Sequence, residues 1–350
     1  MMQVLKYQMT FTAPAFLGDA EQSGRWRTPP IKALLRQWWR MVYAEAHTPS
    51  AMRAMREKEG HLLGNAWLDS GATKSKVRIR LDHWNTGTLL QSHWPALEKA
   101  RHPEVKQMVG ADLYMGFGPV MLPRGEHQPK LKANAAIQAG DHAVLSVAVP
   151  DSDASDMARA LWLMDRYGTL GGRSRNGWGS FTLTPMPGGA LPGETLPIQA
   201  SPILQSWETC LNTDWPHAIG KDAKGPLIWE TSPFSDWKTL MVSLAQLKID
   251  LRTSFKFGQG KPGNPEARHW LAYPVTHHKV NSWGGNARLP NMLRFKIRAT
   301  PDGQVVGVIY LVPHLPPQGF SPDLKTVQQV WSEVLKFMDQ PERHLRRIPV

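Results

Sequence analysis

The residues best suited to chemistry lie in one glycine-rich segment, residues 168–180, which contains five glycines, two arginines and one tryptophan. Glycine lets the backbone approach a ligand closely, arginine supplies charge, and tryptophan offers a face on which a base can stack. We therefore expect a ligand-binding set that consists of Gly171, Gly172, Arg173, Ser174, Arg175 and Trp178. The alternative is structural, because the same glycines could form a tight turn between a helix and a strand.

The segment does not have the pattern of a nucleotide-binding loop. The Gly-Lys-Ser sequence of a P-loop is missing, and a helical pattern precedes the segment while a strand pattern follows it, the reverse of a dinucleotide-binding fingerprint. Nucleotide hydrolysis is therefore disfavoured, and no cofactor is predicted. No metal site is predicted either, because neither an HExxH motif nor a carboxylate-rich cluster occurs and Cys210 is the only cysteine.

Two further basic patterns could contact phosphates. In the helical pattern of residues 31–46, basic side chains recur at i, i+4 and i+8 and so form one stripe, which consists of Lys32, Arg36 and Arg40. Residues 76–81 alternate strictly between basic and apolar side chains, which predicts a strand with one basic face made by Lys76, Arg78 and Arg80. Either set could instead be an ordinary solvated surface.

A third group of residues could cleave RNA without a metal ion. Such cleavage needs a base for the 2′-hydroxyl, an acid for the leaving oxygen and cations for the phosphorane. The polar stretch 255–289 offers such groups in Arg268, His269, His277, His278, Lys279 and Arg288. A rival set consists of Arg25, Arg27, Arg36 and Arg40. No single residue stands out as catalytic, and these histidines could also be exposed loop residues or phosphate contacts.

The composition favours a polyanionic partner. The chain has 350 residues and a formal net charge of +12, and 15 of its residues are tryptophan, a combination that suits neutralising phosphates and stacking bases. No apolar run of about 18 residues occurs, so we expect no membrane span. The first residues lack the features of a secretory signal, and a single cysteine cannot form an internal disulfide, so we expect a cytoplasmic protein.

The glycine-rich segment would be positioned by a βαββαβ arrangement in the first half of the chain. Alternating or periodic apolar residues predict, in order, strand 4–12, helix 31–46, strand 76–81, strand 143–149, helix 152–167 and strand 181–184. This order is typical of a ferredoxin-like unit. We therefore predict an α+β fold whose first domain spans residues 1–184, with an insertion at about residues 47–135.

The second half of the chain is predicted to be a divergent copy of the same unit. Residues 185–202 are rich in proline and glycine and lack periodicity, which indicates a linker. Beyond it, residues 203–350 contain a helical pattern at 237–251, two strand patterns around the turn Asp302-Gly303, and a closing helical pattern at 323–338. The match to a ferredoxin-like unit is weaker here than in the first half.

Several motifs resemble those of a known family. The segments are Ala13-Pro14-Ala15-Phe16-Leu17-Gly18, the run from Arg27 to Arg40 with its Ile-Lys pair and its Arg-x-Trp-Trp-Arg helix, Glu59 to Gly64, Ser75 to Ile79, and the glycine-rich loop Gly171 to Ser180. Together they are similar to the first subunit of the Cmr complex, a member of the CRISPR-associated RAMP superfamily. The resemblance covers roughly the first half, and Leu63 stands where the family usually has an aromatic residue.

The resemblance implies a paired ferredoxin-like fold that holds CRISPR RNA or its target in a basic cleft, within a multi-subunit class 1 effector complex of type III-B or type IV. Such complexes defend against viruses or plasmids. RNA-binding and RNA-processing subunits share this architecture, so two functions follow: RNA binding without cleavage, or a metal-independent endoribonuclease that processes CRISPR RNA and stays bound to it. A general basic scaffold protein is a third and more remote possibility.

Overall fold

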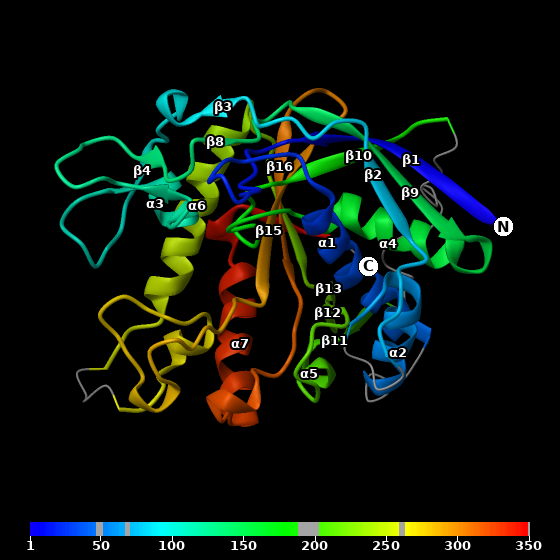
Figure 1. Cartoon of the computed structure of the whole chain (residues 1–350). Helices are drawn as coiled ribbons and strands as arrows, with labels where there is room; N and C mark the ends of the chain where they lie inside the picture. The colour runs from blue at the N-terminus through cyan, green and yellow to red at the C-terminus, as the bar shows by residue number, and fades with distance from the viewer. Residues whose placement is uncertain (47–51, 67–70, 188–202, 259–262, 349–350) are drawn as a thin grey trace.

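The computed structural model describes residues 1–46, 52–66, 71–187, 203–258 and 263–348 and has an α+β architecture, as predicted (Figure 1). Two four-stranded antiparallel sheets form its centre. Most of the predicted linker, from residue 188 to residue 202, lies outside the described residues. Within the described part of the chain, no helix combines the length and apolar character needed to cross a membrane.

The first sheet has the strand order β10-β1-β9-β2. Its elements, in chain order, are β1 (Met2–Phe11), α1 (Thr28–Ala46), β2 (Arg78–Leu81), β9 (His142–Pro150), α4 (Ala154–Tyr167) and β10 (Phe181–Pro185). Alternate residues of β1 are buried, from Leu5 to Phe11, and pack with the apolar faces of α1 and α4. The opposite face of β1, with Val4 and Lys6, is exposed. Each of the elements predicted for this half is present, with ends that differ by a few residues.

The second sheet repeats the arrangement of the first. Its elements are β14 (Ile228–Thr231), α6 (Trp237–Ser254), β15 (Leu293–Ala299), β16 (Val305–Leu311), α7 (Leu324–Met338) and β17 (Leu345–Arg347). The strand order is β15-β16-β14-β17, so each element occupies the position of its counterpart in the first sheet. Asp236 and Asp323 begin the two helices, because their carboxylates accept hydrogen bonds from backbone amides of the first turn.

The two units stack as alternating layers. Helices α1 and α4 lie between the sheets, where the ring of Tyr310 on β16 lies 6.4 Å from that of Trp38 and 5.1 Å from that of Tyr167. Helices α6 and α7 pack in a second core against the other face of the second sheet. Figure 1 shows β15 and β16 running between α1 and α4 on one side and α6 and α7 on the other. Because both faces of the second sheet are covered, its two central strands, β16 and β14, are buried almost throughout.

A buried lysine joins the two units. Lys296 on β15 is fully buried, and its ammonium group donates hydrogen bonds to the backbone oxygens of Asp165 at 2.5 Å and of Gly168 and Phe181 at 2.8 Å. The first two oxygens lie at the carboxyl end of α4, where helix carbonyls have no partner within the helix and the dipole favours a cation. Lys296 therefore caps a helix of the first unit from a strand of the second.

The predicted insertion at residues 47–135 is wrong as a single block, because β2 pairs with β9 inside the main sheet. Two insertions flank β2 instead. The first contains α2 (Met52–Leu63), and the second contains β3 (Leu89–Leu90), β4 (Lys99–Ala100), β5 (Val109–Gly110), α3 (Ala111–Gly116), β6 (Val120–Met121), β7 (Lys130–Leu131) and β8 (Ala135–Ala136). A small sheet of β11 (Leu204–Ser206), β12 (Ile219–Asp222) and β13 (Gly225–Pro226), with α5 (Trp207–Cys210), precedes the second unit.

Candidate nucleic-acid interface

A cleft of about 1280 Å³ lies between the glycine-rich loop, α3, α6 and the segment 272–291. Helices α3 and α6 are in contact and lie side by side in Figure 1. The cationic residues that line the cleft are Arg173, Arg175, Lys248, Arg252, Lys279 and Arg288. His277 lines it as well, and none of its described lining residues is an aspartate or a glutamate. A concave surface of one charge sign concentrates the field and attracts a polyanion.

The glycine-rich loop forms one wall of this cleft through a tight turn. Gly171 and Gly179 have φ angles of +95° and +65°, and a Cβ atom on Gly179 would lie 1.8 Å from the backbone oxygen of Leu170. The amide of Gly172 donates to the backbone oxygen of Phe16 at 3.0 Å. Gly171 and Gly172 do not line the cleft, so both form the tight turn between helix and strand and are not part of the binding surface. Arg173, Ser174 and Arg175 do line the cleft.

The turn fixes its polar side chains against α3 and α6. The Arg173 Nε donates to the backbone oxygen of Phe117 at 2.6 Å, which holds this exposed guanidinium at the mouth of the cleft. The amide of Asn176 donates to the backbone oxygen of Met115 at 2.7 Å, and its Oδ1 accepts from Lys248 Nζ at 2.6 Å. Arg175 lies deeper, where burial, followed by repulsion from Arg294, lowers its pKa to about 10.

Lys248 and Arg252 form the floor of the cleft. They lie one turn apart on α6, and so their side chains share a face. Burial, followed by the charges of Arg252 and Arg173, lowers the pKa of Lys248 to about 7. Burial is also the main cause that lowers the pKa of Arg252. Two desolvated basic groups, with no carboxylate among the described lining residues, form a floor that favours a bound anion.

The rim of the cleft combines exposed cations with an exposed aromatic ring. Phe117 is 66% exposed, which leaves its ring face open for stacking. His277 is exposed and sits at a left-handed turn with φ of +62°, with exposed Lys279 two residues further on. Arg288 donates from Nη1 to its neighbouring Ala287 backbone oxygen at 2.7 Å and forms no ion pair among the described residues. The glycine-rich loop and the histidine-containing stretch therefore meet in one site.

His278 and His269 do not share this site. The ring of His278 stacks on Phe257, with centroids 3.7 Å apart and planes 8° apart, and does not line the cleft. His269 is buried, its Nδ1 accepts from the backbone amide of Glu266 at 2.9 Å, and its Nε2 lies 3.2 Å from the backbone oxygen of His278. Burial lowers the pKa of His269. Of the catalytic candidates in this stretch, His278 is thus engaged in packing, and His277 remains.

The expectation that Trp178 stacks on a base is wrong. Trp178 is fully buried, and its ring centroid lies 5.1 Å from that of Phe16, 5.6 Å from that of Trp94 and 5.8 Å from that of Trp237. The turn at Gly177 and Gly179 directs the side chain into the second core rather than toward solvent. Trp178 therefore supports the loop from behind and offers no face to a ligand.

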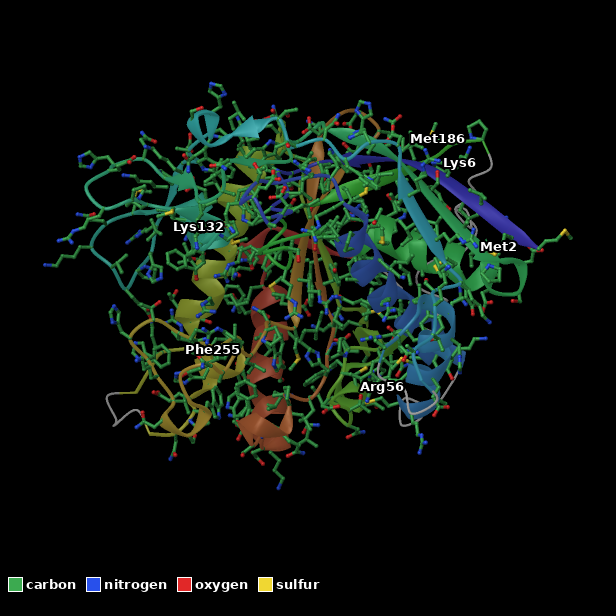
Figure 2. The ribbon with its side chains drawn as sticks, viewed as in Figure 1. Met2, Lys6, Arg56, Lys132, Met186 and Phe255 are labelled. Carbon is green, nitrogen blue, oxygen red and sulfur yellow. The ribbon has the colours of Figure 1, made fainter. Side chains whose placement is uncertain are left out.

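The basic stripe of α1 is largely neutralised. Arg36 donates to Glu59 of α2 at 3.1 Å, and Arg40 donates to the same carboxylate from Nε at 2.6 Å and from Nη2 at 2.9 Å. Arg36 also donates to the backbone oxygens of Leu63 and Gly64. The stripe thus ties α1 to α2, and only half-buried Lys32 lacks such a link among the described residues. In Figure 2, Arg56 of α2 lies to the right of α7, and Phe255, which follows α6, lies to its left.

The Glu59→Gln substitution is expected to lower the free energy of unfolding by about 2 kcal/mol, because it leaves two partly buried guanidinium groups without a countercharge. Urea denaturation would measure the change. Glu57→Gln is the matched control, since the pair of Glu57 with Arg53 is exposed and contributes less than about 0.5 kcal/mol. If the Glu59 variant is as stable as the wild type, Arg36 and Arg40 are available for RNA after all.

The other arginines proposed for catalysis are also engaged locally. Arg25 lies 3.3 Å from Asp19 and 3.5 Å from Glu21, and Arg27 donates to the backbone oxygen of Gly18 at 2.7 Å. Neither Arg25 nor Arg27 lines the cleft, and the same holds for Arg40. They are therefore separate from His277, and the structure brings together no catalytic set from the arginine-rich N-terminal region.

The basic face predicted for residues 76–81 is present. Lys76, Arg78 and Arg80 are exposed, while Val77 and Leu81 are buried. Arg78 and Arg80 border a second hollow of about 460 Å³ on the open face of the first sheet, together with Lys6 of β1 and Asp82. Figure 2 labels Lys6 on β1. The hollow is smaller than the cleft, carries a carboxylate and has no aromatic residue in its lining.

No protein-family model matches the sequence, and no curated protein matches it. Solved structures do match. Cmr1 from Pyrococcus furiosus, in its apo form, has a TM-score of 0.44 and 12% sequence identity, over 94% of this chain and 96% of that one. A chain of the Type III-B Cmr-beta bound to cognate target RNA has a TM-score of 0.47 and 10% identity, over 95% of this chain and all 100% of that one. This chain is similar in structure to Cmr proteins.

Two residues of the cleft floor were missed by the sequence reasoning. The helical pattern predicted at residues 237–251 includes Lys248 but ends just before Arg252, although two cations at i and i+4 beside apolar residues are a visible signal. Phe117, at the mouth of the cleft, was also missed, because it lies in a segment without periodicity. Within the described residues, no group of three or more histidine, cysteine or acidic side chains is placed to hold a metal ion.

Proposed function

We propose that the chain binds single-stranded RNA in the cleft as a RAMP subunit of a class 1 CRISPR effector complex. The observation that carries this proposal is the lining of the cleft, whose described residues include six lysines and arginines and no carboxylate. Phosphates bind to such cations, and the exposed ring of Phe117 suits an unpaired base. The motif resemblance to the Cmr first subunit supports CRISPR RNA or its target as the RNA.

We infer that both units are ferredoxin-like RAMP domains. The support is the order of elements, because each unit runs strand, helix, strand, strand, helix, strand, and each sheet places the fourth strand beside the first, followed by the third and the second. A shared topology in two stacked units is the paired arrangement that the resemblance implies. In this proposal the chain works in the cytoplasm, beside other subunits of the complex.

Processing of CRISPR RNA is the second candidate function. It is favoured by one observation, namely that Lys248 and His277 line the same cleft. Burial lowers the pKa of Lys248 to about 7, which suits a general acid or base near neutral pH. His277 would supply the second proton-transfer group, with Arg173 and Arg288 near the phosphate. Of the catalytic candidates predicted from the sequence, this second proposal keeps His277, adds Lys248 and sets aside the arginines of the N-terminal region.

The two functions are separated by incubating the purified chain with CRISPR repeat RNA in EDTA and following both binding and cleavage. We expect salt-sensitive binding and intact RNA. Cleavage at one position, lost in Lys248→Met, would replace the binding function with the endoribonuclease. Equal affinity for repeat RNA and for random RNA of the same length would instead indicate a general basic scaffold protein.

A further inference from the structure

Two cations on the floor of the cleft lie near a third cation at its mouth. Lys248 and Arg252 share one face of α6, and Arg173 approaches from the glycine-rich loop, close enough for its charge to lower the pKa of Lys248. The ring of Tyr114 on α3 closes the floor, with Lys248 Nζ 5.9 Å from its centroid. The Tyr114 hydroxyl is buried and has no hydrogen-bond partner among the described residues. The floor therefore holds cations and an unused hydroxyl group.

The surrounding residues do not neutralise these charges. Lys248 donates to the uncharged Oδ1 of Asn176, and Arg252 forms no ion pair or hydrogen bond with the described residues. Glu104 lies near Arg252, but Arg268 Nη1 donates to both oxygens of Glu104, at 2.6 and 2.8 Å. Burying like charges together is unfavourable unless an anion completes the group. The floor is thus arranged for an anion that comes from outside the chain.

We propose that Arg173, Lys248 and Arg252 bind a terminal phosphate monoester of the RNA, at its 3′ or its 5′ end. This inference rests on the proposed RNA-binding function. A monoester carries nearly two negative charges at neutral pH, whereas an internal phosphodiester carries one, so the monoester better matches these three cations. An RNA end also needs only one segment of RNA backbone to enter the cleft. An internal phosphate could reach the floor only if the RNA entered the cleft and left it again.

The rim cations are suited to a different part of the ligand. Lys279 and Arg288 are both exposed and line the cleft, so these residues suit the phosphodiesters that follow the terminal nucleotide. Phe117, also at the mouth, would stack on a base near that end. The floor would thus select the chemical state of the RNA end, while the rim would add affinity without discriminating between ends.

The test compares one single-stranded RNA of about ten nucleotides, within the range that single-strand-binding domains hold, in three forms: with hydroxyl groups at both ends, with a 5′-phosphate, and with a 3′-phosphate. Fluorescence anisotropy at pH 7 is expected to show that one phosphorylated form binds about tenfold more tightly than the hydroxyl form, because charged hydrogen bonds are added. The phosphorylated form that binds more tightly shows whether the 5′ or the 3′ end occupies the floor of the cleft. Equal affinity of all three forms overturns the terminal-phosphate site and leaves the RNA cleft standing. Absence of binding by every form overturns both.

Two variants test whether the preference for a phosphorylated RNA end depends on the residues of the cleft floor. Lys248→Met is expected to erase the difference between the phosphorylated and hydroxyl forms, while Lys279→Gln, at the rim, weakens all forms and keeps their ratio. The preference is also expected to fall as the pH rises from 7 to 9. Burial lowers the pKa of free Lys248 to about 7, so at higher pH the group must take up a proton to bind the anion. A preference that survives in Lys248→Met would overturn the assignment to the floor.

Discussion

RNA binding is expected to weaken about 100-fold when Arg173, Lys279 and Arg288 are together replaced by glutamine. All three line the cleft, and Arg173 and Lys279 are exposed, so each can contact a phosphate. Each lost contact with single-stranded RNA lowers the slope of log affinity against log salt by about 0.7, so the slope should fall by about 2. Anisotropy titrations between about 50 and 200 mM salt would measure both effects.

The open face of the first sheet provides the matched control. Lys76, Arg78 and Arg80 are exposed there, and their joint replacement by glutamine removes the same number of charges. We expect this variant to keep its salt slope and most of its affinity, because the hollow beside Arg78 and Arg80 includes Asp82 and no aromatic residue. The reverse result, with the loss confined to the sheet variant, would place the RNA on the sheet and leave the cleft without it.

Local patterns in the sequence predicted most of the elements because those patterns follow from short-range geometry. The alternation at residues 76–81 places Arg78 and Arg80 outward and Leu81 inward, as observed. Periodicity likewise located α1, α4, α6 and α7 to within a few residues. The second unit was harder to recognise, because the small sheet of β11 to β13 precedes it and a long irregular stretch separates α6 from β15.

Side-chain roles that depend on contacts distant in the chain could not be predicted. The spacing of Arg36 and Arg40 predicts a basic stripe whether these residues bind RNA or only form a surface. Only the fold brings Glu59 of α2 into contact with them. Trp178 lies in a glycine-rich segment predicted to bind a ligand, which favoured base stacking, whereas the turn directs the ring into the second core. The cleft itself is built from four separate segments of the chain, and so its uniform charge becomes visible only when α6 packs beside the glycine-rich loop.

Lys248 and Lys296, the two lysines with strongly lowered pKa values, are predicted to differ in their contribution to the free energy of unfolding. Burial lowers the pKa of both Lys248 and Lys296 to about 7. Lys248 has one neutral partner and two cationic neighbours, Arg252 and Arg173. Its replacement by methionine removes repulsion, so we expect the free energy of unfolding to stay within about 1 kcal/mol or to rise. If Lys248→Met is more stable than the wild type and binds RNA more weakly, Lys248 serves binding at a cost in stability, as is typical of functional sites.

Lys296→Met is expected to lower the free energy of unfolding by about 3–5 kcal/mol, as when one partner of a buried charged interaction is removed. Methionine fills a similar volume but leaves the backbone oxygens of Asp165, Gly168 and Phe181 buried without this donor, and each unsatisfied group costs about 1–3 kcal/mol. Urea denaturation at pH 7, with Lys248→Met as the control, would measure the difference. Equal stability of the two variants would show that the end of α4 finds other donors, and that the two units are joined without Lys296.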